Sequence, residues 1–78
     1  MKQEMFVIAT KGRKGKEIYL AVDEERSKLS LKKIFFKWTE NIDEAIATLT
    51  YSDIEDTAKR HFKNYNKWYI RSYDALFV

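Results

Sequence analysis

The chain has 78 residues and a formal net charge of +3, and it contains no cysteine and no proline. At this length folding hides only about 60–65% of the surface of the unfolded chain. We therefore expect a single domain, residues 1–78, whose core depends on its twelve aromatic side chains. The absence of cysteine excludes a disulfide-stabilised scaffold and is compatible with a reducing cytoplasm. With 35% charged residues and no proline, the chain is neither a low-complexity tail nor a linker.

The N-terminal third has the pattern of a β-hairpin. Residues 4–10 (EMFVIAT) and 17–22 (EIYLAV) are rich in β-branched and aromatic side chains, and KGRKGK separates them with two glycines that suit a tight loop. In the second run Ile18, Leu20 and Val22 point to one side and Tyr19 to the other. The apolar run at residues 5–9 is too short for a signal peptide or a membrane span. We expect a soluble cytoplasmic protein with no membrane partner.

The next segment is harder to assign. Residues 23–28 (DEERSK) read as a charged turn, and a strand is predicted over roughly 33–39. Leu29 and Leu31 share a face before Lys32 and Lys33 interrupt the alternation, so a bulge or a separate short strand is expected there.

Two helices are predicted between residues 41 and 66. Ile42, Ala45, Ile46 and Leu49 follow helical spacing, and the apolar pattern then restarts out of phase at Ile54 and Ala58. Asn41 with Glu44, and Ser52 with Glu55, have the spacing of an N-cap and the residue three places on. This predicts helices of about 8 and 13 residues, the second ending at Asn64 or Asn66.

The C-terminal segment, KWYIRSYDALFV, predicts a strand that runs to the end of the chain. Trp68 and Ile70 share one face, and Tyr69, Arg71 and Tyr73 share the other. The fold class expected is α+β: a two-layer sandwich in which a small, mostly antiparallel sheet of 3–4 strands carries two helices on one face, in the order β-β-(β)-α-α-β. Strand order and oligomeric state stay open, and a homodimer through an exposed edge strand is one alternative.

The sequence offers little for catalysis or for a cofactor. It has one histidine, no cysteine, no glycine-rich nucleotide loop and no pair of histidines at metal spacing. His61 lies on the apolar side of the second predicted helix, where a partly buried packing or capping role is expected. Carboxylate clusters at residues 23–25 and 53–56 lack the pattern of a calcium loop and fit a solvated turn and a helix start. We expect a protein that is not an enzyme, with no catalytic residue, metal or cofactor.

Two groups of residues are candidates for binding. The first is the hairpin loop, with Lys11, Arg13, Lys14 and Lys16, which has the charge to contact phosphates, although lysines beside a strand also deter aggregation. The second is the sheet face away from the helices, where Tyr19, Tyr69, Arg71 and Tyr73 are expected to be uncovered. Tyrosine and arginine are enriched at protein interface hot spots, tyrosines on an open sheet also stack nucleic-acid bases, and cross-strand pairing alone also accounts for them.

The whole pattern resembles a known group of proteins. The order of its segments resembles that of small uncharacterised proteins encoded by phages and prophages of low-GC Gram-positive bacteria, staphylococcal phages in particular. The segments are FVIAT, YLAV, KWTENIDEA, SDIEDTAKRHF and WYIRSY. The matching residues are Trp38, Thr39, Asn41, Ala45 and Ala58. The resemblance implies a phage accessory protein that acts in the host cytoplasm by binding a host or defence protein, and it transfers no functional residue. The leading hypothesis is therefore a non-enzymatic protein that binds another protein. The alternative is a nucleic-acid-binding module that uses the basic loop and the tyrosines.

Overall fold

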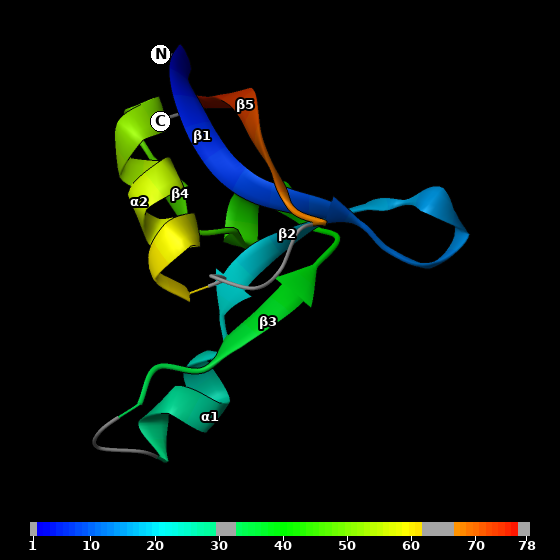
Figure 1. Ribbon diagram of the computed structural model, residues 1–78, viewed down its shortest axis with the longest axis vertical. Helices are drawn as coiled ribbons and strands as arrows, with labels where there is room; N and C mark the ends of the chain where they lie inside the picture. Colours follow the sequence, from blue (N-terminus) through cyan, green and yellow to red (C-terminus); the bar gives the residue numbers. More distant parts are fainter. Residues whose placement is uncertain (1, 30–32, 62–66, 77–78) are drawn as a thin grey trace.

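The computed structural model describes residues 2–29, 33–61 and 67–76 and is organised around one antiparallel sheet (Figure 1). Within these residues the sheet has five strands, accompanied by two α-helices and two short 3-10 turns. In chain order these elements are β1 (Lys2–Lys11), η1 (Arg13–Gly15), β2 (Glu17–Val22), α1 (Glu24–Lys28), β3 (Phe36–Thr39), η2 (Ile42–Glu44), β4 (Ala47–Thr48), α2 (Tyr51–His61) and β5 (Tyr69–Leu76). The expected α+β class is confirmed, with one strand more than the 3–4 predicted.

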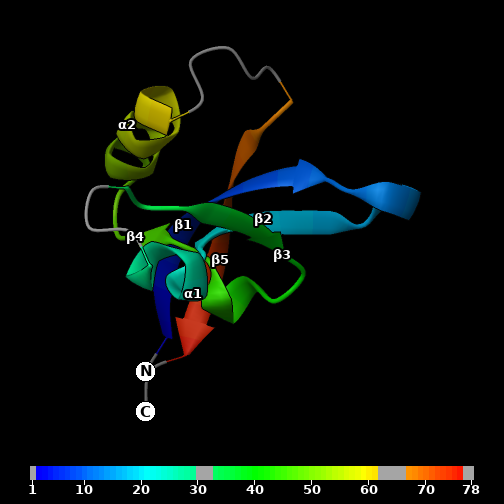
Figure 2. The same ribbon diagram turned by 90° about the horizontal axis from the view of Figure 1, so that it is seen from below.

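Strand β1 is the centre of the sheet. It pairs with β5 along eight residues, from Lys2 opposite Leu76 to Ala9 opposite Tyr69. Its other side is shared between β4, at Phe6 and Val7, and β2, which forms the predicted hairpin from Ala9 opposite Tyr19 onward. Strand β3 then pairs with β2. Seen from below, the β1–β2 hairpin extends away from the rest of the molecule (Figure 2).

The core lies between this sheet and α2. Ile8 and Leu20 from the sheet pack against Ile54 and Ala58 of α2, and all four are buried; the half-buried side chains around them are Phe6, Phe36, Trp38, Ile46, Trp68 and Ile70. Cross-strand pairing explains this grouping, because Ile8 lies opposite Ile70 and directly opposed side chains in a sheet share one face. Trp68 and Ile70 therefore lie on the helix side, as the alternation predicts.

The helix predicted from Ile42 to Leu49 is wrong. Asn41 does act as an N-cap, accepting a hydrogen bond from the Asp43 amide at 3.0 Å, but only the 3-10 turn η2 follows. Ala45 is already extended, with ψ of 153°, and the Ile46 amide donates to the Leu20 carbonyl at 2.9 Å. The sheet thus takes the backbone groups that a helix would use, and the segment becomes β4.

The second predicted helix exists but begins two residues earlier than expected. Thr50 Oγ1 accepts a hydrogen bond from the Asp53 amide at 3.2 Å, so Thr50 occupies the capping position that was predicted for Ser52. Thr50 and Asp53 have the same three-residue spacing as Ser52 and Glu55, which is why the sequence pattern did not separate them. The predicted end of this helix, at Asn64 or Asn66, lies outside the described residues.

The charged turn at residues 23–28 is a short helix, α1. Asp23 caps it by accepting from the Arg26 amide at 3.2 Å, and none of its residues is buried. Of the α-helices in the described residues, α2 alone covers the sheet, whereas two helices on one face were predicted. A bulge or short strand was expected before β3, but residues 30–32 of that segment lie outside the described part of the chain. Residues 77 and 78, which were predicted to belong to the C-terminal strand, also lie outside it.

Candidate binding surface

The face of the sheet away from α2 carries the four residues that the sequence selects for binding. Tyr19 of β2 and Tyr69 of β5 both lie opposite Ala9 of β1, one on each side. The next two residues of β5 on the same face of the sheet are Arg71 and Tyr73. We call the surface formed by Tyr19, Tyr69, Arg71 and Tyr73 the tyrosine face. Arg71 is exposed, but the three tyrosines are half-buried rather than bare.

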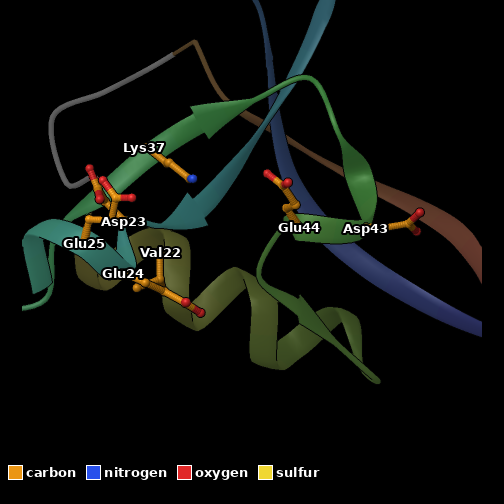
Figure 3. Close-up of a pocket in the computed structure, with 7 residues that line it drawn as sticks. All are labelled: Val22, Asp23, Glu24, Glu25, Lys37, Asp43 and Glu44. Carbon is orange, nitrogen blue, oxygen red and sulfur yellow. The ribbon is translucent and has the colours of Figure 1, made fainter. Parts of the chain in front are cut away.

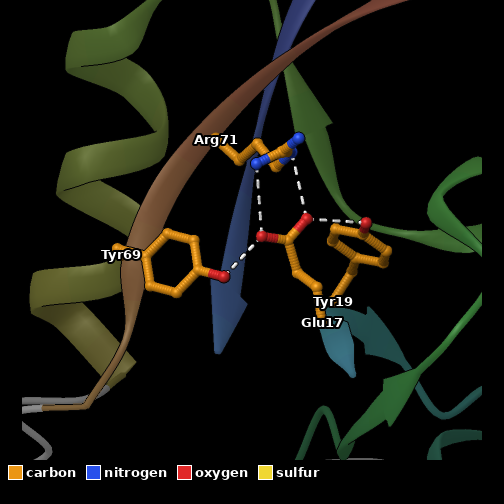
Figure 4. Close-up of polar contacts among 4 residues, drawn as sticks. All are labelled: Glu17, Tyr19, Tyr69 and Arg71. Atoms are coloured by element: carbon orange, nitrogen blue, oxygen red, sulfur yellow. Dashed lines mark hydrogen bonds and ion pairs between the residues drawn. The ribbon is translucent and has the colours of Figure 1, made fainter. Parts of the chain in front are cut away.

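Three of these four side chains converge on Glu17, the first residue of β2 (Figure 4). Tyr19 donates its hydroxyl to Glu17 Oε1 at 2.8 Å, and Tyr69 donates to Oε2. Arg71 approaches from the side, with Nε 3.0 Å from Oε1 and Nη1 3.3 Å from Oε2. Each carboxylate oxygen of Glu17 therefore contacts one phenol and the guanidinium of Arg71. We call Glu17, Tyr19, Tyr69 and Arg71 the Glu17 cluster. Its side chains come from β2 and β5, the two strands that lie on either side of β1.

The cluster depends on a small residue between the two tyrosines. Ala9 is fully buried even though it lies on the face away from α2. With only a methyl group at this position, Tyr69 of β5 can reach across β1 to the carboxylate of Glu17 on β2, which Tyr19 contacts from its own strand. A larger side chain here would occupy the space that the two rings share.

The cluster shifts the pKa values of its members. Partial burial alone would raise the pKa of Glu17, but the hydrogen bonds from Tyr69 and Tyr19 and the positive charge of Arg71 outweigh it, so the pKa is lowered. The pKa values of Tyr19 and Tyr69 are raised, chiefly because each hydroxyl donates to Glu17 and secondarily because of burial. These shifts widen the pH range over which Glu17 is ionised while both phenols stay protonated.

Tyr73 lies apart from the Glu17 cluster. It lines a shallow hollow farther along β5, together with Met5, Asp43, Ala45, Ala47, Ala75 and Leu76. Burial, and to a smaller extent the negative charge of Asp43, raises the pKa of Tyr73. The tyrosine face therefore has a polar, internally paired part around Glu17 and a more apolar part around Tyr73.

The predicted phosphate contacts lie at the projecting end of the β1–β2 hairpin, with Lys11 as the last residue of β1 and the other three on the loop. Lys11, Arg13, Lys14 and Lys16 are all exposed, and none of the four forms an ion pair within the part of the chain that the structure describes. The loop is closed by the Gly12 amide, which donates to the Lys16 carbonyl at 2.7 Å. Its turn requires left-handed backbone at Lys14 (φ 63°) and Gly15 (φ 74°), a conformation that glycine adopts without strain.

A pocket lined mainly by carboxylates lies at the other end of β2 (Figure 3). Lys37 of β3 projects between Asp23, Glu24 and Glu25 on one side and Asp43 and Glu44 on the other. Two of these carboxylates have local structural roles: Asp23 caps α1, and Glu44 Oε2 accepts from Thr39 Oγ1 at 3.1 Å. Among residues 2–29, 33–61 and 67–76, no group of three His, Cys, Asp or Glu is placed to hold a metal ion.

His61, the one histidine, lies at the end of α2 and is exposed. Its ring lies against Phe36, with 4.6 Å between the ring centroids. The ring contact agrees with a packing role, but the expected partial burial of His61 is not found.

Glu17 is the residue that the sequence did not single out. The signal was present, because Glu17 and Tyr19 share one face of β2 while Tyr69 and Arg71 share one face of β5. Joining the two pairs requires the knowledge that β2 and β5 flank the same strand, and strand order is not written in a single sequence.

Comparison of the chain with protein-family models, with curated proteins and with solved structures finds no match in any of the three. None of the helices in the described residues has the length and apolar character needed to cross a membrane.

Proposed function

We propose that this protein is a non-enzymatic binding protein that recognises another protein through its tyrosine face. The observation that supports this proposal is the Glu17 cluster. Its hydrogen bonds hold two tyrosine rings and an arginine in fixed positions before any partner arrives, and rings that are already ordered lose little conformational entropy on binding. Tyrosine and arginine are also the residue types that most often dominate protein interfaces.

The charge of the cluster favours a protein over a nucleic acid on this face. Glu17 neutralises Arg71 and places a carboxylate between the two tyrosines that would have to stack bases. A phosphate backbone crossing this surface would meet that negative charge, whereas a protein surface with apolar and polar groups would not. The hollow beside Tyr73 adds an apolar recess that suits a side chain of the partner.

The partner class follows from the resemblance to phage-encoded proteins, which favours a host or defence protein in the cytoplasm of the bacterial host. In this role the protein would modulate its target by occupying a surface, with no chemical step of its own. No part of the proposal requires a cofactor.

Affinity capture with matched variants tests the proposal. The double variant Tyr73→Ala/Arg71→Ala alters the tyrosine face, and the double variant Tyr51→Ala/Arg60→Ala removes the same two residue types from α2, where both are exposed. Bacterial proteins enriched by the wild type and by the α2 variant should be lost with the tyrosine-face variant, provided that circular dichroism shows all three folded. Equal enrichment by all three proteins would refute the tyrosine face as the binding surface.

A second candidate function is nucleic-acid binding, favoured by the four exposed cations of the projecting hairpin loop, which form no ion pair within the described residues. If all four contact phosphates of a single strand, log K should fall with log salt with a slope of about −3, since each contact contributes roughly −0.7. Tryptophan fluorescence during titration with single-stranded and duplex DNA measures this directly. Saturable, salt-sensitive binding that disappears when Lys11, Arg13, Lys14 and Lys16 are replaced by serine would establish this function in place of the first.

A further inference from the structure

The β1–β2 hairpin ends in a cationic tip that projects from the body of the molecule (Figure 2). We call residues 11–16 the hairpin tip. Its four cations, Lys11, Arg13, Lys14 and Lys16, are exposed, and none forms an ion pair within the described residues. The tip contains no carboxylate and no apolar or aromatic side chain. Six consecutive residues therefore present four charges of one sign to solvent.

The carboxylates of the protein leave this charge largely uncompensated. Asp23, Glu24 and Glu25 lie beyond the far end of β2, and a rise of about 3.3 Å per residue places them roughly 17 Å or more from the tip. This separation is about twice the Debye length of ≈ 8 Å at physiological ionic strength. Glu17 follows the tip directly, but Arg71 pairs with it at 3.0 Å. The tip is therefore an attractive site for a polyanion.

The backbone at the apex adds a second observation. Lys14, the middle residue of η1, has φ of 63°, and a residue with a side chain pays about 1 kcal/mol for this left-handed conformation. Glycine would adopt the same turn without strain. The sequence places a cation there instead. Strain at an exposed charged residue is typical of a position whose side chain is used in binding.

The composition and shape of the tip favour double-stranded DNA among polyanions. A DNA duplex carries one negative charge per about 1.7 Å of its axis, a density that suits four cations grouped within six residues. Its major groove, about 12 Å wide, admits a two-stranded β-ribbon, whereas the deep, narrow major groove of an RNA duplex does not. Single strands are held largely by stacking on aromatic rings, which the tip lacks, and Tyr19 and Tyr69 are bound to Glu17. A lipid surface would favour apolar side chains, which the tip also lacks.

We propose that the hairpin tip binds double-stranded DNA by entering the major groove, with its four cations on phosphates along the two walls of the groove. This inference rests on the second candidate function and narrows it to one class of nucleic acid and one element of the fold. Because the four side chains are used on phosphates, affinity should depend little on base sequence.

Fluorescence anisotropy with a labelled 20-base-pair DNA duplex of mixed sequence tests the proposal. With four phosphate contacts, log K should fall with log salt with a slope of about −3.6, so affinity should drop roughly 150-fold between 50 and 200 mM salt. The separated strands and an RNA duplex of the same sequence should bind at least tenfold more weakly at equal salt.

A matched pair of variants separates the tip from net charge. Lys14→Gly removes one cation and relieves the backbone strain, so the hairpin should keep its turn. It should weaken duplex binding about eightfold at 0.1 M salt and bring the slope to about −2.7, the effect of one lost phosphate contact. Arg60→Ala removes one cation from the exposed side of α2 and should leave the slope unchanged. Equal losses in the two variants would overturn the inference, because net charge alone would then govern binding.

Competition identifies the groove. Methyl green, which occupies the major groove, should displace the protein, and netropsin, which occupies the minor groove, should not. Displacement by netropsin alone, or single strands or duplex RNA bound as tightly as duplex DNA, would overturn this inference and leave the second candidate function standing. No saturable binding to any of the three nucleic acids would overturn both, also where the protein binds vesicles of anionic lipid instead.

Discussion

Replacing Glu17 by glutamine should lower the free energy of unfolding by about 2 kcal/mol. The two phenol hydrogen bonds lose their charge assistance, which is worth roughly 0.5–1 kcal/mol each. In glutamine one carboxylate oxygen is replaced by an amide nitrogen, which cannot accept a hydrogen bond from the phenol beside it. The lost ion pair adds less than about 1 kcal/mol, because the Arg71 side chain is 55% exposed and solvent screens its charge. In a domain of this size, such a loss lowers Tm by roughly 8–16 °C.

Urea denaturation followed by tryptophan fluorescence measures this effect. Glu55→Gln is the matched control, because Glu55 forms an exposed ion pair with Lys59 at 3.3 Å on α2, and such pairs contribute about 0.3–0.5 kcal/mol. If Glu17→Gln costs no more than Glu55→Gln, or if a double-mutant cycle of Glu17 with Tyr69 gives no coupling, the structural role assigned to the cluster is wrong.

The same variant should change the pH dependence of stability. The pKa of Glu17 is lowered in the folded protein, so its contribution is present above the carboxyl's ordinary pKa and is lost as pH falls through the lowered value. The pKa values of Tyr19 and Tyr69 are raised, so their contribution is complete below the ordinary tyrosine pKa and is lost as pH rises above it. Glu17→Gln should flatten both limbs of the stability profile, and an unchanged acid limb would contradict this assignment.

Three further predictions concern the fold. Thr50→Ala should cost about 0.5–2 kcal/mol by removing the α2 cap, while Ser52→Ala should change the free energy of unfolding by less than about 0.5 kcal/mol; the reverse order in urea melts would place the cap at Ser52. Gly15→Ala should cost about 1 kcal/mol through backbone strain alone, because a Cβ there meets open space, and thermal melts that match the wild type would disprove the left-handed turn. Deleting residues 74–78 removes the β1 pairs of Asp74, Ala75 and Leu76 and should markedly lower Tm, whereas a fully stable truncation would exclude the β1–β5 register.

The sequence predicted well wherever a short local pattern decides the structure. The two-residue alternation in residues 17–22 and 68–73 correctly separated Leu20, Trp68 and Ile70 from Tyr19 and Tyr69 across the sheet. The two glycines and the basic run around them correctly indicated a loop between β1 and β2. In these segments each residue's preference agrees with the final structure.

Prediction failed where a distant segment decided the local structure. The helical spacing from Ile42 to Leu49 is real, but Leu20 and Val7 supply sheet partners for residues 46 and 47, and these hydrogen bonds prevail over helix propensity. Glu17 was overlooked for the same reason, since its partners Tyr69 and Arg71 lie more than fifty positions away. Local pattern carries no information about such pairings.

The pairing of Lys2 with Leu76 also constrains how the molecule forms. The longest ladder in the sheet joins the first described strand to the last, so β1 cannot complete its hydrogen bonds until residues 69–76 have been synthesised. Before that point only the β1–β2 hairpin, β3, β4 and α2 can assemble, and the side of β1 that pairs with β5 stays uncovered. Contacts between such distant segments slow folding, so the closing step should be rate-limiting, and the β5 side of β1 stays exposed to non-native pairing until β5 is in place.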